Sequence, residues 1–197
     1  MDEKKQIEDM KAVLISIQPK WCKLIASGKK TVEVRKTRPK LETPFKVYIY
    51  CSQNTPYNPV IPMIYQKEGG NIYIGGKRYA EFLTGKVIGE FVCDKIDEYR
   101  YGVYDGEFCY HIPTVKGEKS CMEYTEAEEY GNGKPLYFWH ISDLVIYEKP
   151  KELSEFTRFC EGVGGKNGCR GCDNSRPLKR PPQSWCYVEQ FMEENRT

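Results

Sequence analysis

The sequence predicts a mainly β protein with short rim helices, an α+β fold. Three observations support this prediction: short runs of β-branched and aromatic residues recur along the chain, few segments have helical spacing, and Gly and Pro separate the runs. The chain has 197 residues, of which 40% are hydrophobic and 13% are aromatic. That composition is sufficient for a buried core, so it excludes disordered and collagen-like proteins.

The first predicted elements follow a charged N-terminal decapeptide. Residues 11 to 17, KAVLISI, are apolar and β-branched, which is typical of a short buried strand. A helix is predicted from Pro19 to Ser27, because Pro19 suits a first helical turn and apolar residues from Trp21 onward recur at helical spacing. Gly28 then supplies the expected C-terminal stop.

Residues 31 to 36, TVEVRK, alternate with the period of a strand. Val32 and Val34 are expected to face a core, and Glu33 and Arg35 to project from the opposite face. Three further runs predict strands: KVYIYC at 46–51, KVIGEFVC at 86–93 and LYFWHISDLVIY at 136–147.

The remaining segments predict an insertion, a second helix and a terminal extension. Residues 52–85 are rich in Pro, Gly, Asn and Tyr and lack clean periodicity, which indicates an insertion that packs on the sheet or covers a site. Residues 118–130 are acidic helix formers followed by GNG, which predicts one short helix. Composition shifts after Pro150, so we expect a domain over 11–150 and a Cys-rich basic extension over 151–197 packed on it.

Charge is unevenly distributed along the chain. The formal net charge is only +2, but residues 28–40 hold six cations and one acid, and residues 166–180 hold five cations and one acid. Residues 118–129 carry five glutamates and one lysine. The two basic segments are suited to phosphate, because exposed Lys and Arg bind polyanions without sequence preference.

The composition also indicates the compartment and the state of the cysteines. No apolar run approaches the roughly 20 residues that cross a bilayer, and the charged start is unlike a signal peptide, so a cytoplasmic protein without membrane partner is predicted. Nine cysteines in such a chain argue against a disulfide framework. A structural zinc site is one interpretation of the C-terminal cysteines; free or buried thiols and a redox C-x-x-C pair are the alternatives. Its four candidate ligands are Cys160, Cys169, Cys172 and Cys186.

The segment IQPKWCKLIASGKKTVEVRK resembles the ASCH domain of the PUA-like superfamily, through a G-x-K-x-x-E-x-R pattern formed by Gly28, Lys30, Glu33 and Arg35. KVIGEFVCDKI and WHISDLVIY are similar to its middle and closing strands. The resemblance implies a PUA-like β pseudo-barrel, here with a C-terminal Cys-rich extension, and a cleft that binds RNA or a modified nucleotide. Some relatives hydrolyse N4-acetylcytidine or cleave RNA. In the amidohydrolase relatives a lysine matching Lys30 acts with a threonine and a distant glutamate, and Glu33 stands at that threonine position.

The candidate ligand-binding residues follow from the motif and the basic segment around it. Cations grip phosphate, and a carboxylate among them can accept from the exocyclic amine of cytosine. If the protein is an enzyme, Lys30 and Glu33 are the candidate catalytic pair, and no cofactor is required. Two alternatives stay open: an exposed ion-pair ladder without function, and an interaction module with no nucleic-acid role. The candidate binding residues are Lys29, Lys30, Thr31, Glu33, Arg35, Lys36 and Arg38.

Other polar and aromatic residues have structural interpretations. His140, Ser142 and Asp143 are too close in sequence for a catalytic triad, because neighbours on a strand point to alternate faces. His140 is therefore expected to be a hydrogen-bonded structural residue. Most aromatic side chains near the motif are expected in the core rather than as stacking platforms: Trp21, Tyr48, Tyr50, Tyr137 and Trp139.

Overall fold

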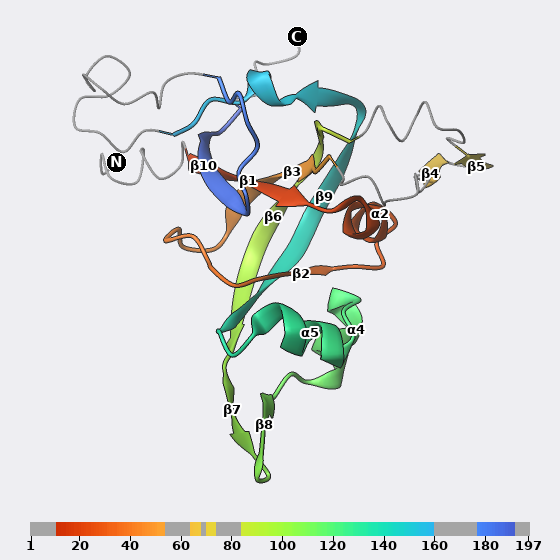
Figure 1. The fold of residues 1–197 in the computed structure, drawn as a ribbon. Helices are drawn as coiled ribbons and strands as arrows, with labels where there is room; N and C mark the ends of the chain where they lie inside the picture. The colour runs from red at the N-terminus through yellow and green to blue at the C-terminus, as the bar shows by residue number, and fades with distance from the viewer. Residues whose placement is uncertain (1–10, 54–63, 68–69, 74–83, 160–176, 192–197) are drawn as a thin grey trace, which may run out of the picture.

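The computed structural model describes residues 11–53, 64–67, 70–73, 84–159 and 177–191, and most of its strands form one curved sheet (Figure 1). The six-stranded sheet has the order β10-β1-β3-β6-β9-β2, and two hairpins, β4-β5 and β7-β8, lie outside it. The strands are β1 (Lys11–Ile17), β2 (Val32–Arg35), β3 (Phe45–Cys51), β4 (Ile64–Lys67), β5 (Gly70–Tyr73), β6 (Lys86–Tyr99), β7 (Tyr101–Tyr104), β8 (Glu107–Tyr110), β9 (Leu136–Glu152) and β10 (Trp185–Glu189). The helices are α2 (Pro19–Ala26), α4 (Thr114–Ser120), α5 (Tyr124–Gly131) and the 3-10 turn η1 (Leu153–Glu155).

Two long central strands give the sheet its curvature. β6 and β9 pair antiparallel through several register shifts, and an added Cβ at Gly89 would lie 2.3 Å from the carbonyl oxygen of Val145. Register shifts and glycine are the features that bend a strand and increase its twist. Residues Tyr137 to His140 of β9 also pair with β2 on the other side.

The curvature brings the two outer strands of the sheet toward each other. Trp185 Nε1 in β10 donates to Thr37 Oγ1 just after β2, at 2.9 Å, and the backbone N–H of Lys40 donates to the Tyr187 hydroxyl at 2.8 Å. In the described chain these outer strands meet through such contacts and not through a backbone ladder. The mainly β fold is thus confirmed, with an incompletely closed sheet in place of a hydrogen-bonded barrel.

Both faces of the sheet are packed. One face carries the cluster around Ile15, Ile49 and Trp139, against which α2 places Cys22 and Ile25. The other face is covered by η1 and C-terminal residues, which bury Leu14 and Tyr48. A third cluster lies under α5 and includes Val32 and Val34 of β2, so β2 packs on a cluster of its own.

Several predicted elements are confirmed and others need correction. β1 and α2 match their predictions, whereas β6 and β9 run further than expected. The single helix predicted over 118–130 is wrong: α4 and α5 are separated at Cys121, whose φ of 53° is left-handed and ends the first helix. The β7-β8 hairpin had not been predicted, although Asp105-Gly106 is a strong signal for its turn.

The strands β9 and β10 concern the predicted boundary at residue 150 between the domain and the C-terminal extension. β9 continues across residue 150 to Glu152, and β10 pairs with β1 inside the main sheet. Much of the predicted 52–85 insertion and residues 160–176 lie outside the described residues. The division into 11–150 and 151–197 stays a prediction.

Candidate functional site

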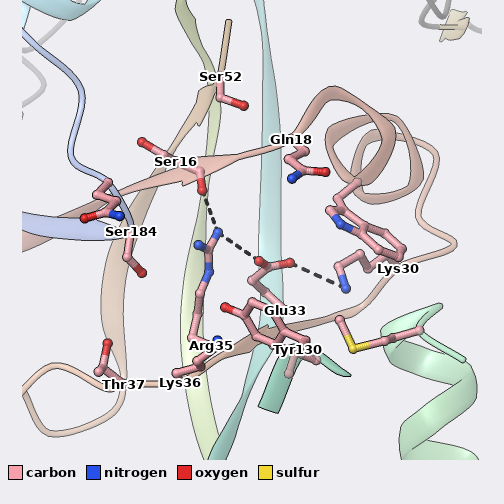
Figure 2. A pocket seen from close by; sticks show the side chains of 14 residues that line it. Ser16, Gln18, Lys30, Glu33, Arg35, Lys36, Thr37, Ser52, Tyr130 and Ser184 are labelled. Carbon is pink, nitrogen blue, oxygen red and sulfur yellow. Dashed lines mark hydrogen bonds and ion pairs between the residues drawn. The ribbon is translucent and has the colours of Figure 1, made fainter. Parts of the chain in front are cut away.

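A pocket of about 550 Å³ opens beside β2, between α2, the end of β1 and the α4-α5 segment (Figure 2). Ligand pockets commonly measure roughly 300–1,000 Å³, so it can admit a nucleoside-sized molecule. Three cations and one carboxylate are among its walls. The lining residues are Ser16, Gln18, Trp21, Lys30, Glu33, Val34, Arg35, Lys36, Thr37, Ser52, Met122, Tyr130, Gln183 and Ser184.

Strand β2 places the central pair of polar side chains. Its alternation sends Val32 and Val34 into the cluster under α5, as predicted. Glu33 and Arg35 leave from the other face, toward β1, but the curled sheet encloses them, and both are buried. The predicted alternative of an exposed ion-pair ladder is therefore wrong.

The lysine of the motif is more deeply buried than any other charged side chain in the described residues. Lys30 has 1% of its surface exposed, and its Nζ donates to the carbonyl oxygen of Ser120 at 2.5 Å. The same nitrogen lies 3.5 Å from Glu33 Oε2 and 4.7 Å from the centroid of the Trp21 ring. Burial lowers the pKa of Lys30, and the attraction of Glu33 opposes that shift.

The turn before β2 explains how a lysine reaches this position. Gly28, with φ of +72°, ends α2 in the left-handed region that favours glycine. Lys30 then donates its backbone N–H to Leu24, and Thr31 donates to Lys119 in α4. The chain is held on both sides of Lys30, which directs its side chain inward.

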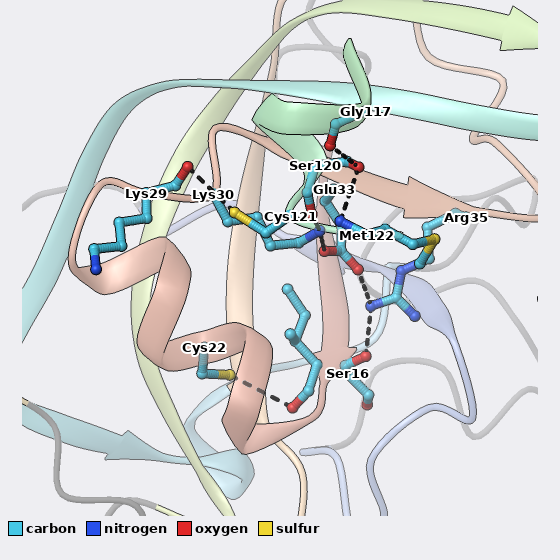
Figure 3. A network of polar contacts seen from close by, with 11 residues as sticks. Ser16, Cys22, Lys29, Lys30, Glu33, Arg35, Gly117, Ser120, Cys121 and Met122 are labelled. Carbon is cyan, nitrogen blue, oxygen red and sulfur yellow. Dashed lines mark hydrogen bonds and ion pairs between the residues drawn. The ribbon is translucent and has the colours of Figure 1, made fainter. Parts of the chain in front are cut away.

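Glu33 and Arg35 form a second ion pair that reaches across to β1. Arg35 Nη2 lies 2.9 Å from Glu33 Oε1 and donates to the carbonyl oxygen of Ser16 at 2.7 Å (Figure 3). Two buried atoms of this pair, Glu33 Oε2 and Arg35 Nε, have no hydrogen-bond partner among the described residues. Buried polar atoms are normally hydrogen-bonded, so Arg35 Nε is a donor without an acceptor, and Glu33 Oε2 is an acceptor that has only the 3.5 Å ion pair with Lys30. Together they match a ligand edge that offers a donor and an acceptor.

The α4-α5 segment closes the opposite wall of the pocket. The backbone N–H of Met122 donates to Ser120 Oγ at 3.2 Å, and the Cys121 thiol donates to the carbonyl oxygen of Lys29 at 3.4 Å. Tyr130, near the end of α5, has its ring 4.7 Å from Lys36 Nζ, and burial raises its pKa. This wall thus rests on contacts with the same turn that positions Lys30.

The structure brings together some of the predicted binding residues and separates others. Lys30, Glu33, Arg35 and Lys36 line the pocket. The other three are not among the lining residues: Lys29 and Arg38 are exposed elsewhere, and Thr31 is occupied in backbone hydrogen bonds.

Several pocket residues had not been predicted. Ser16 and Gln18 immediately precede α2, and Gln183 and Ser184 arrive from the C-terminal segment, more than 160 residues later in the chain. Ser16 and Gln18 could have been predicted from their position in the segment that carries the G-x-K-x-x-E-x-R motif. Nothing in the local sequence marks the C-terminal pair, because only the pairing of β10 with β1 brings it there.

The aromatic candidates divide between pocket and core. Trp21 lines the pocket, although its ring is faced by Lys20 and Lys30 Nζ at 4.1 and 4.7 Å. Tyr48, Tyr50 and Trp139 are buried in the sheet clusters. Tyr137 is partly buried and packs against the cluster that contains Trp139.

The histidine on β9 makes structural contacts. His140 Nε2 lies 2.8 Å from Asp97 Oδ2, whereas Ser142 donates to the carbonyl oxygen of Val92. Neither residue lines the pocket. These separate partners agree with the expectation that this sequence cluster is no triad.

The predicted zinc ligands cannot be compared as a set. Cys160, Cys169 and Cys172 lie outside the described residues, and Cys186 is buried in β10 among apolar side chains. Burial raises the pKa of the Cys186 thiol. Within the described ranges there is no cluster of three or more His, Cys, Asp or Glu side chains.

Comparison with known proteins identifies similar sequences and folds. The family model of the ASCH domain matches residues 15–157. The solved structure of ASCH from Zymomonas mobilis is 19% identical, with a TM-score of 0.54, covering 91% of this chain and 88% of that one. Crystal structures of two point variants of the same bacterial protein match with TM-scores of 0.54 and 0.53 and cover about the same share of both chains. No curated protein sequence matches. Among the described helices, none has the length and apolar character to span a membrane.

Proposed function

The chain belongs to the ASCH family, a PUA-like domain type associated with RNA binding, and from this premise we propose that its pocket binds single-stranded RNA or a modified nucleotide. The supporting observation is the buried group of Lys30, Glu33 and Arg35, in which Arg35 Nε lacks a hydrogen-bond partner among the described residues and Glu33 Oε2 has only the ion pair with Lys30 Nζ, 3.5 Å away. A nucleobase edge offers the complementary donor and acceptor.

The charges around the pocket suit the phosphate that accompanies such a base. Lys36 is exposed at the pocket wall, and Lys30 and Arg35 add two positive charges against the one negative charge of Glu33. An excess of cations raises the local concentration of a polyanion, and the buried carboxylate adds selectivity for the base. The same pocket can therefore attract the phosphate groups of the RNA and recognise a base.

Binding can be measured by fluorescence anisotropy with labelled single-stranded RNA decamers of each base and with free modified nucleosides as competitors. We expect salt-sensitive binding to RNA, and Glu33→Gln to weaken it about tenfold or more, because a charged carboxylate that only accepts hydrogen bonds becomes a neutral amide that also donates them. Glu33→Gln retains the shape of the side chain, so its thermal unfolding is the control for folding.

A matched pair of lysine variants separates pocket binding from general charge. Lys36→Ala and Lys29→Ala remove the same charge seven residues apart in one segment, but only Lys36 lines the pocket. Lys36→Ala should lower the slope of log affinity against log salt by about 0.7, the amount expected for one phosphate contact on a single strand, and Lys29→Ala should change it less. Equal effects of both variants, or no binding by the wild type, would contradict the proposal.

A hydrolase acting on a modified nucleoside, or a ribonuclease, is the second candidate, and one observation favours it. Burial lowers the pKa of Lys30 beside a carboxylate, which increases the fraction of neutral amine available as a base or nucleophile. Incubation with N4-acetylcytidine and with single-stranded RNA, followed by chromatography, tests it. Product formation that Lys30→Met abolishes would support the enzyme; binding without product would leave the binding function.

A further inference from the structure

The β7-β8 hairpin projects at one end of the molecule, beyond the main sheet (Figure 1). Its side chains form an exposed apolar patch. Phe108 is 67% exposed and Val103 59%, and the two residues are paired across the hairpin. Tyr101 shares their face, because it lies two residues from Val103 on the same strand. Of the exposed large apolar side chains in the described residues, only Val145 lies outside residues 101–124. A concentrated patch of this kind marks an interaction site.

One edge of the hairpin also presents free backbone groups. The two-residue turn Asp105-Gly106 has positive φ at both positions, so Tyr104 and Glu107 form the hydrogen-bonded closing pair. Pairs alternate along an antiparallel ladder, so the backbone N–H and C=O groups of Tyr101 and Val103 point outward. In the described part of the chain these groups have no hydrogen-bond partner.

The opposite edge of the hairpin is already occupied at its base. The backbone N–H of Tyr110 donates to the Tyr124 hydroxyl at 3.2 Å, and its carbonyl oxygen accepts from Ile112 at 3.0 Å. β7 is therefore the edge to which a strand can be added. Its sequence, YGVY, contains neither charge nor proline, the residues that usually protect an exposed edge from pairing.

Charge selects the kind of partner. Residues 101–131, which span the hairpin, α4 and α5, contain seven acids and two lysines, a net charge of −5. This charge repels RNA and a second copy of the same lobe, and it attracts a cationic chain. Asp105 and Glu107 lie directly at the turn, beside the apolar patch.

We propose that β7 binds an extended, basic polypeptide segment of a partner protein as a third strand of the hairpin. Alternate side chains of that segment would contact Val103 and Phe108, and its basic residues would pair with the acids around the turn. Backbone hydrogen bonds supply affinity in this mode of recognition, and the alternate side chains supply selectivity. The pocket around Lys30 is not needed for it, so this site is independent of the RNA-binding proposal.

The test uses the full chain and a labelled ten-residue peptide that alternates arginine and valine, with binding followed by anisotropy. A second peptide that alternates arginine and proline keeps the charge but cannot form a strand ladder. We expect the arginine-valine peptide to bind at least tenfold more tightly than the arginine-proline peptide. The double variant V103T/F108T should lose at least tenfold in affinity, whereas V145T, at an apolar residue that is 50% exposed on β9, should not.

A second variant keeps the test valid if the first does not fold. D105N/E107Q retains the turn residues' shape, and it should weaken peptide binding and reduce its salt dependence. Equal binding of both peptides, no binding of either, or unchanged affinity in the variants would overturn the proposal. Sedimentation velocity showing a dimer that V103T/F108T dissociates would instead assign the edge to a second copy. Binding of RNA that V103T/F108T weakens and V145T does not would assign the edge to nucleic acid.

Discussion

Individual residues in the pocket differ from surface residues of the same type by their burial. Lys30 and Lys20 each pair with a glutamate, but the Lys30 pair is buried, whereas Lys20 and Glu126 have side chains 45% and 42% exposed. Removing one member of a buried pair leaves an uncompensated charge, which costs several kcal/mol, whereas exposed pairs contribute little. The same chemical change should therefore have very different consequences at the two positions.

We predict that Lys30→Met lowers the free energy of unfolding by about 2–4 kcal/mol, because Glu33 and the carbonyl oxygen of Ser120 both lose a partner. Lys20→Met should change it by less than about 1 kcal/mol. Urea unfolding followed by fluorescence measures both. Similar values for the two variants would mean that the Lys30 ion pair is solvated in solution.

A second residue gives a pH dependence of stability. Burial raises the pKa of Tyr48 from 10 to about 12, and its hydroxyl accepts from the backbone N–H of Phe191 at 2.9 Å. Between these pKa values the unfolded chain loses the proton that the folded chain keeps, so this group lowers stability as pH rises from 10 toward 12. At pH 11 the loss amounts to about 1.4 kcal/mol.

Tyr48→Phe removes this titration and leaves the Phe191 N–H without an acceptor. The variant should be less stable than wild type by about 1–2 kcal/mol at pH 8, and the difference should shrink by about 1.4 kcal/mol at pH 11. Denaturant unfolding at the two pH values gives the comparison. A difference that stays constant with pH would show that Tyr48 has an ordinary pKa in the folded protein.

At the scale of elements, α5 depends on a glycine at its last position. A Cβ added to Gly131 would lie 2.1 Å from the Tyr110 hydroxyl, which donates to the carbonyl oxygen of Lys134 at 2.6 Å. Gly117, inside α4, has nothing within 4 Å of the corresponding position. Gly131 therefore allows α5 to pack closely against Tyr110, whereas no neighbouring atom requires a glycine at position 117.

The same substitution should act in opposite directions at these glycines. Gly131→Ala is expected to destabilise by about 1–3 kcal/mol, because the buried Tyr110 ring must move. Gly117→Ala should stabilise by about 0.5–1 kcal/mol through helix propensity. Thermal unfolding of both variants checks the signs. Destabilisation by Gly117→Ala would show that α4 needs a glycine for a reason other than space.

Element prediction succeeded where the signal is local. The period-two pattern at Val32 and Val34 identified β2, and Pro19 and Gly28 bounded α2 within one or two residues. The helix over 118–130 was mispredicted because a single left-handed residue, Cys121, divides a segment whose composition is helical throughout. For the site, the motif identified the buried charges, but contacts such as Lys30 to Ser120, 90 residues apart, depend on how the sheet curls.

At the scale of the whole molecule, β10 makes the C-terminal residues part of the main sheet. It pairs with β1 from Lys11 to Ile15, and Leu178 and Val188 are buried in the cluster that covers Leu14. Gln183 and Ser184 also complete the pocket wall. The described C-terminal segment therefore serves both the core and the site.

A chain that ends at residue 159 tests this dependence. Loss of β10 exposes an edge of β1 and removes buried groups such as Val188 and Leu178, each worth about 2–5 kcal/mol when truncated, against a total stability of about 5–15 kcal/mol. We expect the shortened chain to lose its near-UV circular dichroism and cooperative unfolding. A chain that ends at residue 191 keeps every described C-terminal residue and should retain both signals. Cooperative unfolding of the 1–159 chain at the wild-type midpoint would instead show that residues 11–150 fold independently and that the extension is an addition to them.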